Sequence, residues 1–141
     1  MREVVVDACV AVKWFVQEKD SPLALQLFDP GIRRIAPDFL LTELANAFWK
    51  SVRLGRMKAG TQSAALGSAA KFFWSLSAAR SLVGDALDLA TQIDHPVYDC
   101  LYVIASRRAK VSLVTTDTKL IAKLAGTPDA PNVILLSDWK P

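Results

Sequence analysis

The chain has 141 residues, of which 52% are hydrophobic and 22% charged, and its formal net charge is +3. This length can bury a sizeable core but is short for two ordinary domains, so we expect residues 1–141 to form one domain. No apolar stretch reaches the roughly 18 uncharged residues that a membrane helix requires, which argues against a membrane partner. Arg2 and Glu3 directly follow Met1, so we expect no signal segment and a cytoplasmic location.

The predicted elements alternate between strand and helix, with no repeat, low-complexity tract or linker. Strands are expected at residues 2–7, 34–36, 111–117 and 133–136. Helices are expected at residues 9–17, 22–29, 37–54, 61–76, 81–93, 97–109 and 118–125. This order of strand–helix units with an extra helical insert predicts an α/β fold.

The first strand and the strand at 111–117 are short β-branched runs that end in an acid, Asp7 and Asp117. Such runs are typical of strands covered on both faces in a parallel sheet. Ligand sites of open α/β sheets lie beyond the carboxyl ends of the strands, so both acids are expected at the functional edge. Period-two alternation puts Thr115 on the side of Asp117, where its hydroxyl is placed to hold a neighbouring carboxylate.

Glu43 lies in the long helix at 37–54, where Asn46 and Lys50 share its face. We expect this face to form a crevice wall. The opposite face is expected to enter the core with Leu41, Leu44 and Phe48. Asp99 is a single acid among apolar neighbours in the first turn of the helix at 97–109, where the helix N-terminus favours its ionised form.

Each of these four acids has an ordinary alternative explanation. Asp99 fits an N-terminal helix acid, Glu43 a surface residue, and Asp7 and Asp117 caps of the helices that follow them. Together, however, they would bury like charges in one crevice, which is costly unless a cation compensates. Oxygen ligands without nitrogen or sulfur select Mg²⁺ or Mn²⁺.

The two cysteines and the single histidine do not suggest a zinc site, because finger-type zinc needs four soft ligands in paired spacing. Cys9 and Cys100 are expected as small buried residues in a reducing compartment, with a disulfide between them as the alternative. His95 precedes Pro96 and is expected as a turn residue outside the chemistry, with a direct general-base role as the minor alternative.

Four segments, taken in order, resemble one family. They are Val5 to Phe15, Ala36 to Asn46, Tyr98 to Tyr102, and Leu113 to Asp117. Together they are similar to the PIN domain of VapC-type toxin ribonucleases over nearly the whole chain. The resemblance implies a three-layer α/β sandwich whose central parallel sheet is flanked by helices. It also implies Mg²⁺- or Mn²⁺-dependent cleavage of RNA, homodimerisation, and inhibition by a cognate antitoxin protein.

The resemblance carries the family's catalytic quartet onto Asp7, Glu43, Asp99 and Asp117. Asp7 and Asp99 are then the principal metal ligands, Asp117 is a further ligand, and Glu43 binds directly or through water. The resemblance also implies that Asn46 and Thr115 orient the carboxylates. Two positions depart from the pattern, because Cys9 and Cys100 stand where the family often has Ser and Ala. The first departure is expected to weaken a hydrogen bond near Asp7.

Charge is consistent with a polyanionic substrate but does not prove one. Without the four site carboxylates, the rest of the chain carries +7 (3 + 4 = 7). The basic residues cluster as Arg33 and Arg34, as Lys50, Arg53, Arg56 and Lys58, and as Arg107, Arg108 and Lys110. An RNA-binding groove and ordinary solvated faces explain these clusters about equally well. The aromatic residues Trp49 and Phe72 to Trp74 fit either the core or a patch that a second subunit or an antitoxin covers.

Three other classes of protein share part of this pattern. A haloacid-dehalogenase-type phosphotransferase needs a second acid two residues after Asp7, where the chain has Cys9. A dinucleotide enzyme needs a glycine-rich first turn, and residues 8–12 contain no glycine. A catalytically inactive PIN-fold module that binds RNA or protein stays open as the main alternative.

Overall fold

The computed structural model describes residues 1–141 and contains one sheet of five parallel strands in the order β3-β2-β1-β4-β5. The strands are β1 (Arg2–Val6), β2 (Ile32–Pro37), β3 (Ser75–Ser77), β4 (Leu113–Thr115) and β5 (Val133–Leu135). Val4, Val5 and Val6 of the central strand are fully buried, because helices cover both faces of the sheet. The predicted central parallel sheet is therefore confirmed.

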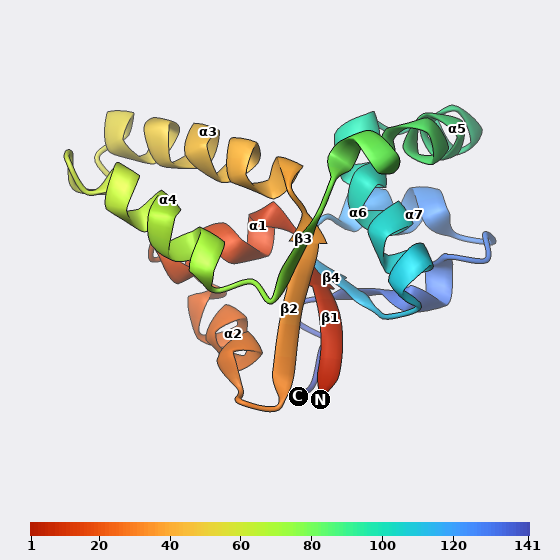
Figure 1. Cartoon of the computed structure of the whole chain (residues 1–141), viewed down its shortest axis with the longest axis horizontal. Helices are drawn as coiled ribbons and strands as arrows, with labels where there is room; N and C mark the ends of the chain where they lie inside the picture. Colours follow the sequence, from red (N-terminus) through yellow and green to blue (C-terminus); the bar gives the residue numbers. More distant parts are fainter.

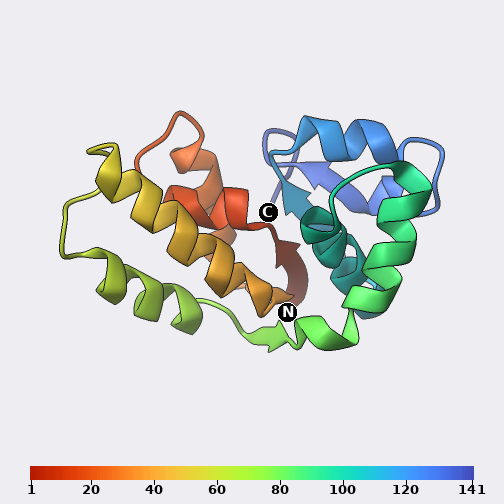
Figure 2. The ribbon, with the colours of Figure 1, turned by 90° about the horizontal axis from the view of Figure 1, so that it is seen from above.

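Seven α-helices surround the sheet. They are α1 (Ala8–Ala11), α2 (Ser21–Leu25), α3 (Phe39–Arg53), α4 (Gln62–Lys71), α5 (Val83–Ile93), α6 (Val97–Ala109) and α7 (Thr118–Leu124). Single 3-10 turns lie at Val12–Trp14, Gln26–Phe28, Ala79–Ser81 and Ala130–Asn132. Helices α1 to α4 lie on one side of the sheet and α5 to α7 on the other, which gives the predicted three-layer α/β sandwich (Figures 1 and 2).

The predicted helix at 61–76 is wrong at its C-terminal end. Helix α4 stops at Lys71, and Ser75–Ser77 forms strand β3 beside β2. The backbone N–H of Trp74 already donates to the carbonyl of Arg34, which starts this pairing. The free edge of β2 thus offers hydrogen bonds to an extended chain, and these outweigh the local helical preference of a short segment.

The boundaries of most other elements differ from the prediction by one or two residues. Pro37 ends β2, and helix α3 begins only at Phe39. The first and second predicted helices are each a short α-helix continued by a 3-10 turn. These changes are small, but they set where the chain leaves the sheet toward α3.

Helix α3 packs on the core through Leu40, Leu44 and Phe48, all of which are buried. Leu41, predicted in the core, is only partly buried, because residues four apart share one face and that face begins at Leu40. This rotation leaves Glu43 beside the carboxyl edge of the sheet.

The aromatic residues divide between the core and the surface. Phe73 is buried and Phe72 packs against the core, stacked on Phe15 at 5.8 Å. Trp49 and Trp74 are 56% and 64% exposed. Both cysteines are free thiols, so the alternative of a disulfide is wrong. None of the helices has the length and apolarity needed to span a membrane.

Candidate active site

The four predicted acids come from four different elements at the carboxyl end of the sheet. Asp7 follows β1 and Asp117 follows β4, and these parallel neighbours are paired through Val6 and Val114. Glu43 lies near the start of α3, and Asp99 lies in the first turn of α6. Their charges act on one another, since Asp99 raises the pKa of both Asp7 and Glu43.

Asp7 is the most buried of the four, with 3% of its surface exposed. Burial, with the charge of Asp99, raises its pKa to about 6. Thr115 opposes this rise, because its Oγ1 donates to Asp7 Oδ2 at 2.7 Å. The backbone N–H of Asp117 donates in turn to Thr115 Oγ1 at 3.0 Å. Asp7 occupies the N-cap position of α1, but its side chain makes no capping bond there, so capping does not explain the carboxylate.

Glu43 is held by a residue that the sequence analysis did not single out. Tyr102 of α6 is buried, and its hydroxyl donates to Glu43 Oε1 at 2.6 Å. Burial is the main cause that raises the pKa of Glu43 to about 7, and the hydrogen bond lowers it in part. The explanation of Glu43 as a plain surface residue is therefore wrong. The sequence signal that could have identified Tyr102 is its spacing from Asp99, since residues three positions apart share one helix face.

His95 also enters the acidic cluster, contrary to the expectation that it lies outside the site. Its Nε2 is 2.8 Å from Asp99 Oδ2 and 3.6 Å from Asp117 Oδ2. His95 does lie in the turn between α5 and α6, but it is four positions before Asp99 and only 9% of its side chain is exposed. The i, i+4 spacing of His95 and Asp99 was the signal that could have placed it here.

The two carboxylate oxygens of Asp117 make different contacts. Its Oδ1 accepts the backbone N–H of Leu120 at 3.0 Å and caps α7, as the ordinary alternative predicted. Its Oδ2 faces His95 Nε2. One ligand atom each from His95, Asp99 and Asp117 lies within 4.8 Å of the others, a grouping that suits a metal ion.

Asn46 shares a hollow with Glu43 but does not contact it by a hydrogen bond. The hollow, of about 380 Å³, lies between α3 and the start of α6. Its other lining residues are Phe39, Thr42 and Tyr98. Asn46 is exposed there, so it faces whatever molecule enters the hollow.

Cys9 lies beside Thr115 and Asp7. Its Sγ is 3.5 Å from Thr115 Oγ1 and accepts the backbone N–H of Thr116 at 3.4 Å. Burial raises the pKa of the Cys9 thiol to about 12, so it is neutral at physiological pH. These sulfur contacts are longer than ordinary hydroxyl hydrogen bonds, because a thiol is a weak donor and a weak acceptor.

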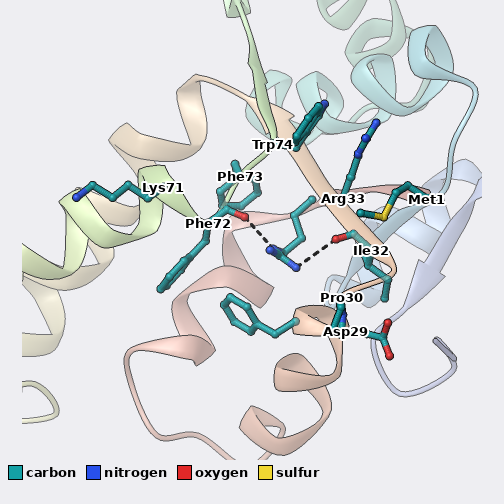
Figure 3. A pocket seen from close by; sticks show the side chains of 11 residues that line it. Met1, Asp29, Pro30, Ile32, Arg33, Lys71, Phe72, Phe73 and Trp74 are labelled. Carbon is teal, nitrogen blue, oxygen red and sulfur yellow. Dashed lines mark hydrogen bonds between the residues drawn. The ribbon is translucent and has the colours of Figure 1, made fainter.

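A second hollow, of about 290 Å³, contains none of the four acids (Figure 3). It lies where β2 and β3 begin, around Arg33, Lys71 and Trp74. Arg34 there donates to the carbonyls of Phe72 and Ile32, and thereby joins α4 to β2. Because this hollow is at the opposite end of the strands from Asp7 and Asp117, we do not assign the chemistry to it.

The donor set at the carboxyl edge fits a hard divalent cation. Burial and neighbouring negative charges raise the pKa of Asp7, Glu43 and Asp99 together, with burial the largest cause for each. A bound cation would remove this repulsion and favour the ionised forms. Carboxylate oxygens are the ligands that Mg²⁺ and Mn²⁺ prefer.

No family model matches the chain. The chain is 28% identical to Ribonuclease VapC3 of Pyrobaculum aerophilum over 123 residues, which are 86% of this chain and 94% of that protein.

Three solved structures share the fold. The protein PAE2754 of Pyrobaculum aerophilum has a TM-score of 0.69 at 23% identity, over 96% of this chain and 85% of that one. A chain of a toxin–antitoxin complex from Klebsiella pneumoniae has a TM-score of 0.63 at 14% identity, over 94% and 97%. A chain of VapBC2 from Rickettsia felis bound to promoter DNA has a TM-score of 0.61 at 16% identity, over 94% and 96%.

The chain thus has the fold of the PIN-domain proteins. The predicted resemblance to the VapC-type ribonucleases is confirmed.

Proposed function

We propose that this protein is a metal-dependent ribonuclease that hydrolyses RNA phosphodiester bonds, and that it is the toxin of a toxin–antitoxin pair. The observation that carries the proposal is the convergence of Asp7, Glu43, Asp99 and Asp117 on one edge of a parallel sheet. The similarity to Ribonuclease VapC3, over 86% of the chain, supports the choice of RNA as substrate.

In this proposal Asp7, Asp99 and Asp117 hold the cation, which is Mg²⁺ or Mn²⁺, and Glu43 contacts it directly or through water. When bound, the ion supplies an activated water and polarises the phosphate. Thr115 orients Asp7 through the hydrogen bond to Oδ2. Tyr102 occupies Glu43 Oε1, which leaves Oε2 to accept a proton from the attacking water.

The basic clusters differ in their availability for phosphate contacts. Arg107 pairs with Asp129 at 2.8 Å, and Arg108 pairs with Asp85 at the same distance. By contrast, Lys50 and Lys58 are exposed and form no ion pair. Because Lys50 is on α3, the helix of Glu43, we propose that the cluster at residues 50–58 contacts the RNA backbone.

We propose two protein partners, an antitoxin and a second copy of the chain. We propose a cognate antitoxin, in line with the toxin–antitoxin complex of Klebsiella pneumoniae that shares the fold. We also propose a homodimer, because Val83 and Leu87 of α5 are large apolar residues at 47% and 57% exposure. Light scattering during size-exclusion chromatography measures the dimer mass. An RNA substrate would place the activity in the cytoplasm.

The decisive experiment incubates the purified chain with labelled single-stranded RNA in Mg²⁺, in Mn²⁺ and in EDTA, beside an Asp99→Asn variant. Cleavage that requires the ion and is lost in the variant supports the proposal. RNA binding without cleavage under all three conditions would instead identify a catalytically inactive binding module.

A further inference from the structure

We propose that His95 is itself a ligand of the cation, so that the centre is a mixed nitrogen and oxygen site that prefers Mn²⁺ to Mg²⁺. This inference rests on the proposed function, because it names a further ligand of the same metal site. It is carried by the position of one imidazole nitrogen between two carboxylates.

The geometry favours a shared ion over a simple hydrogen bond. His95 Nε2 lies 2.8 Å from Asp99 Oδ2 and 3.6 Å from Asp117 Oδ2. An imidazole nitrogen carries at most one proton, so it can donate fully to only one of these oxygens. Neighbouring ligands of a six-coordinate ion, each about 2.1 Å from it, are about 3 Å apart. The two distances bracket that separation, so one ion can contact all three atoms after small shifts.

The backbone holds the His95 ring at this place before any ion binds. Asp94 ends α5 in the left-handed conformation, with φ of 54°, and turns the chain back. The His95 N–H then donates to the carbonyl of Ala90 at 3.2 Å. Pro96, with φ of −55°, leads directly into α6. A ring that is 91% buried and fixed in this way loses little conformational entropy when it binds.

The chemistry of the donor atom predicts the selectivity. Mg²⁺ strongly prefers oxygen ligands. Imidazole nitrogen binds Mn²⁺ more favourably than it binds Mg²⁺, and it binds later transition-metal ions more strongly still. Replacing one water or carboxylate oxygen by a nitrogen should therefore raise the affinity for Mn²⁺ relative to Mg²⁺. The four acids alone give no reason for such a difference.

The chain offers an unusually direct test, because His95 is its only histidine. Pulsed electron paramagnetic resonance on the tag-free protein loaded with Mn²⁺ detects the hyperfine coupling of a directly bound imidazole nitrogen. We expect this coupling in the wild type. We expect its loss in His95→Gln, which still binds Mn²⁺ through its carboxylates. Calorimetric titrations should show the ratio of Mn²⁺ to Mg²⁺ affinity falling about 10-fold or more in the variant.

The outcomes separate this inference from the proposed function. If the wild type binds Mn²⁺ and cleaves RNA but shows no imidazole coupling, His95 is not a ligand and only the inference fails. If the wild type binds no Mn²⁺ and cleaves no RNA with any ion, both fail. The wild-type spectrum decides the inference even if His95→Gln does not fold, and circular dichroism checks the fold of that variant.

Discussion

Tyr102 and Glu43 are 59 positions apart in the chain, and the tyrosine hydroxyl donates a 2.6 Å hydrogen bond to the glutamate Oε1. This contact joins α6 to α3 across the site. Tyr102 is buried and Glu43 is partly buried. Tyr102 therefore positions the acid to which we assign the proton transfer.

Tyr102→Phe should lower RNA cleavage about 10- to 100-fold, the usual cost of losing a partner that orients an active-site carboxylate. The hydrogen bond lowers the pKa of Glu43, so its loss should move the acidic limb of the pH–rate profile to higher pH. Thr91→Val, which removes a hydroxyl group at an exposed position of α5 away from the acids, is the control. An unchanged rate and profile in Tyr102→Phe would contradict the assignment.

Asp7→Asn and Asp99→Asn should each abolish cleavage while the fold stays intact, because each exchange keeps the size and deletes a charge that the cation requires. Without metal, Asp7→Asn should unfold at a temperature equal to or above that of the wild type, since the buried charge is unfavourable. Asp138→Asn, at an exposed position, is the control. The rate is measured on labelled RNA. Cleavage at the wild-type rate by either site variant would show that the substituted residue does not belong to the active site.

The stability of the metal-free protein should fall as the pH rises from about 4 to about 7. The folded pKa values of Asp7, about 6, and Glu43, about 7, lie above the ordinary values of 3.8 and 4.5. The folded state therefore binds more protons than the unfolded state in this range, and deprotonation favours unfolding. Thermal melts across this range test the slope, and a stability that rose with pH would refute it.

Millimolar Mg²⁺ or Mn²⁺ at pH 7.5 should raise the melting temperature, because an ion bound only by the folded state stabilises it. Calorimetric melts with and without the ion measure this shift. Asp99→Asn, which lacks a proposed ligand, should show a smaller rise. An equal rise in the wild type and the variant would point to non-specific binding.

Asn46→Ala should cut cleavage about 10- to 100-fold with little change in the free energy of unfolding. Asn46 is exposed in the hollow of about 380 Å³ that it shares with Glu43, so we expect it to contact the substrate or the waters around Glu43. Gln92→Ala removes an exposed amide from α5 and serves as the control. Wild-type cleavage by Asn46→Ala across a metal titration would show that this face of α3 does not line the active site.

Lys50→Gln combined with Lys58→Gln should weaken RNA binding and reduce its dependence on salt by about one unit of slope for each lost phosphate contact. Arg108→Gln should leave binding nearly unchanged, because Arg108 is engaged with Asp85. Fluorescence anisotropy with an uncleaved RNA analogue at several salt concentrations measures both quantities. If Arg108→Gln weakened RNA binding more than the double lysine variant, the RNA would lie along the end of α6 and not along α3.

The parts of the fold that depend on local pattern can be predicted from the residues alone. The valine run before Asp7 predicts a buried parallel strand, and the run before Asp117 predicts its partner; these two strands are neighbours in the sheet. Alternation along the second run also indicated the side of Thr115, whose hydroxyl does hold Asp7. Helical periodicity similarly predicted α3 and α6, with errors of two residues or fewer at their ends.

Other features depend on contacts between residues far apart in the chain, and local pattern does not predict them. Strand β3 forms because the edge of β2 is free to pair with it, and nothing within Ser75–Ser77 signals this. The Tyr102 hydroxyl finds Glu43 because α6 packs beside α3. His95 reaches two carboxylates because a left-handed residue turns it toward the first turn of α6 and the end of β4. Local sequence sets the period of an element, whereas the packing of elements sets which side chains meet, and the chemistry of this site depends on the latter.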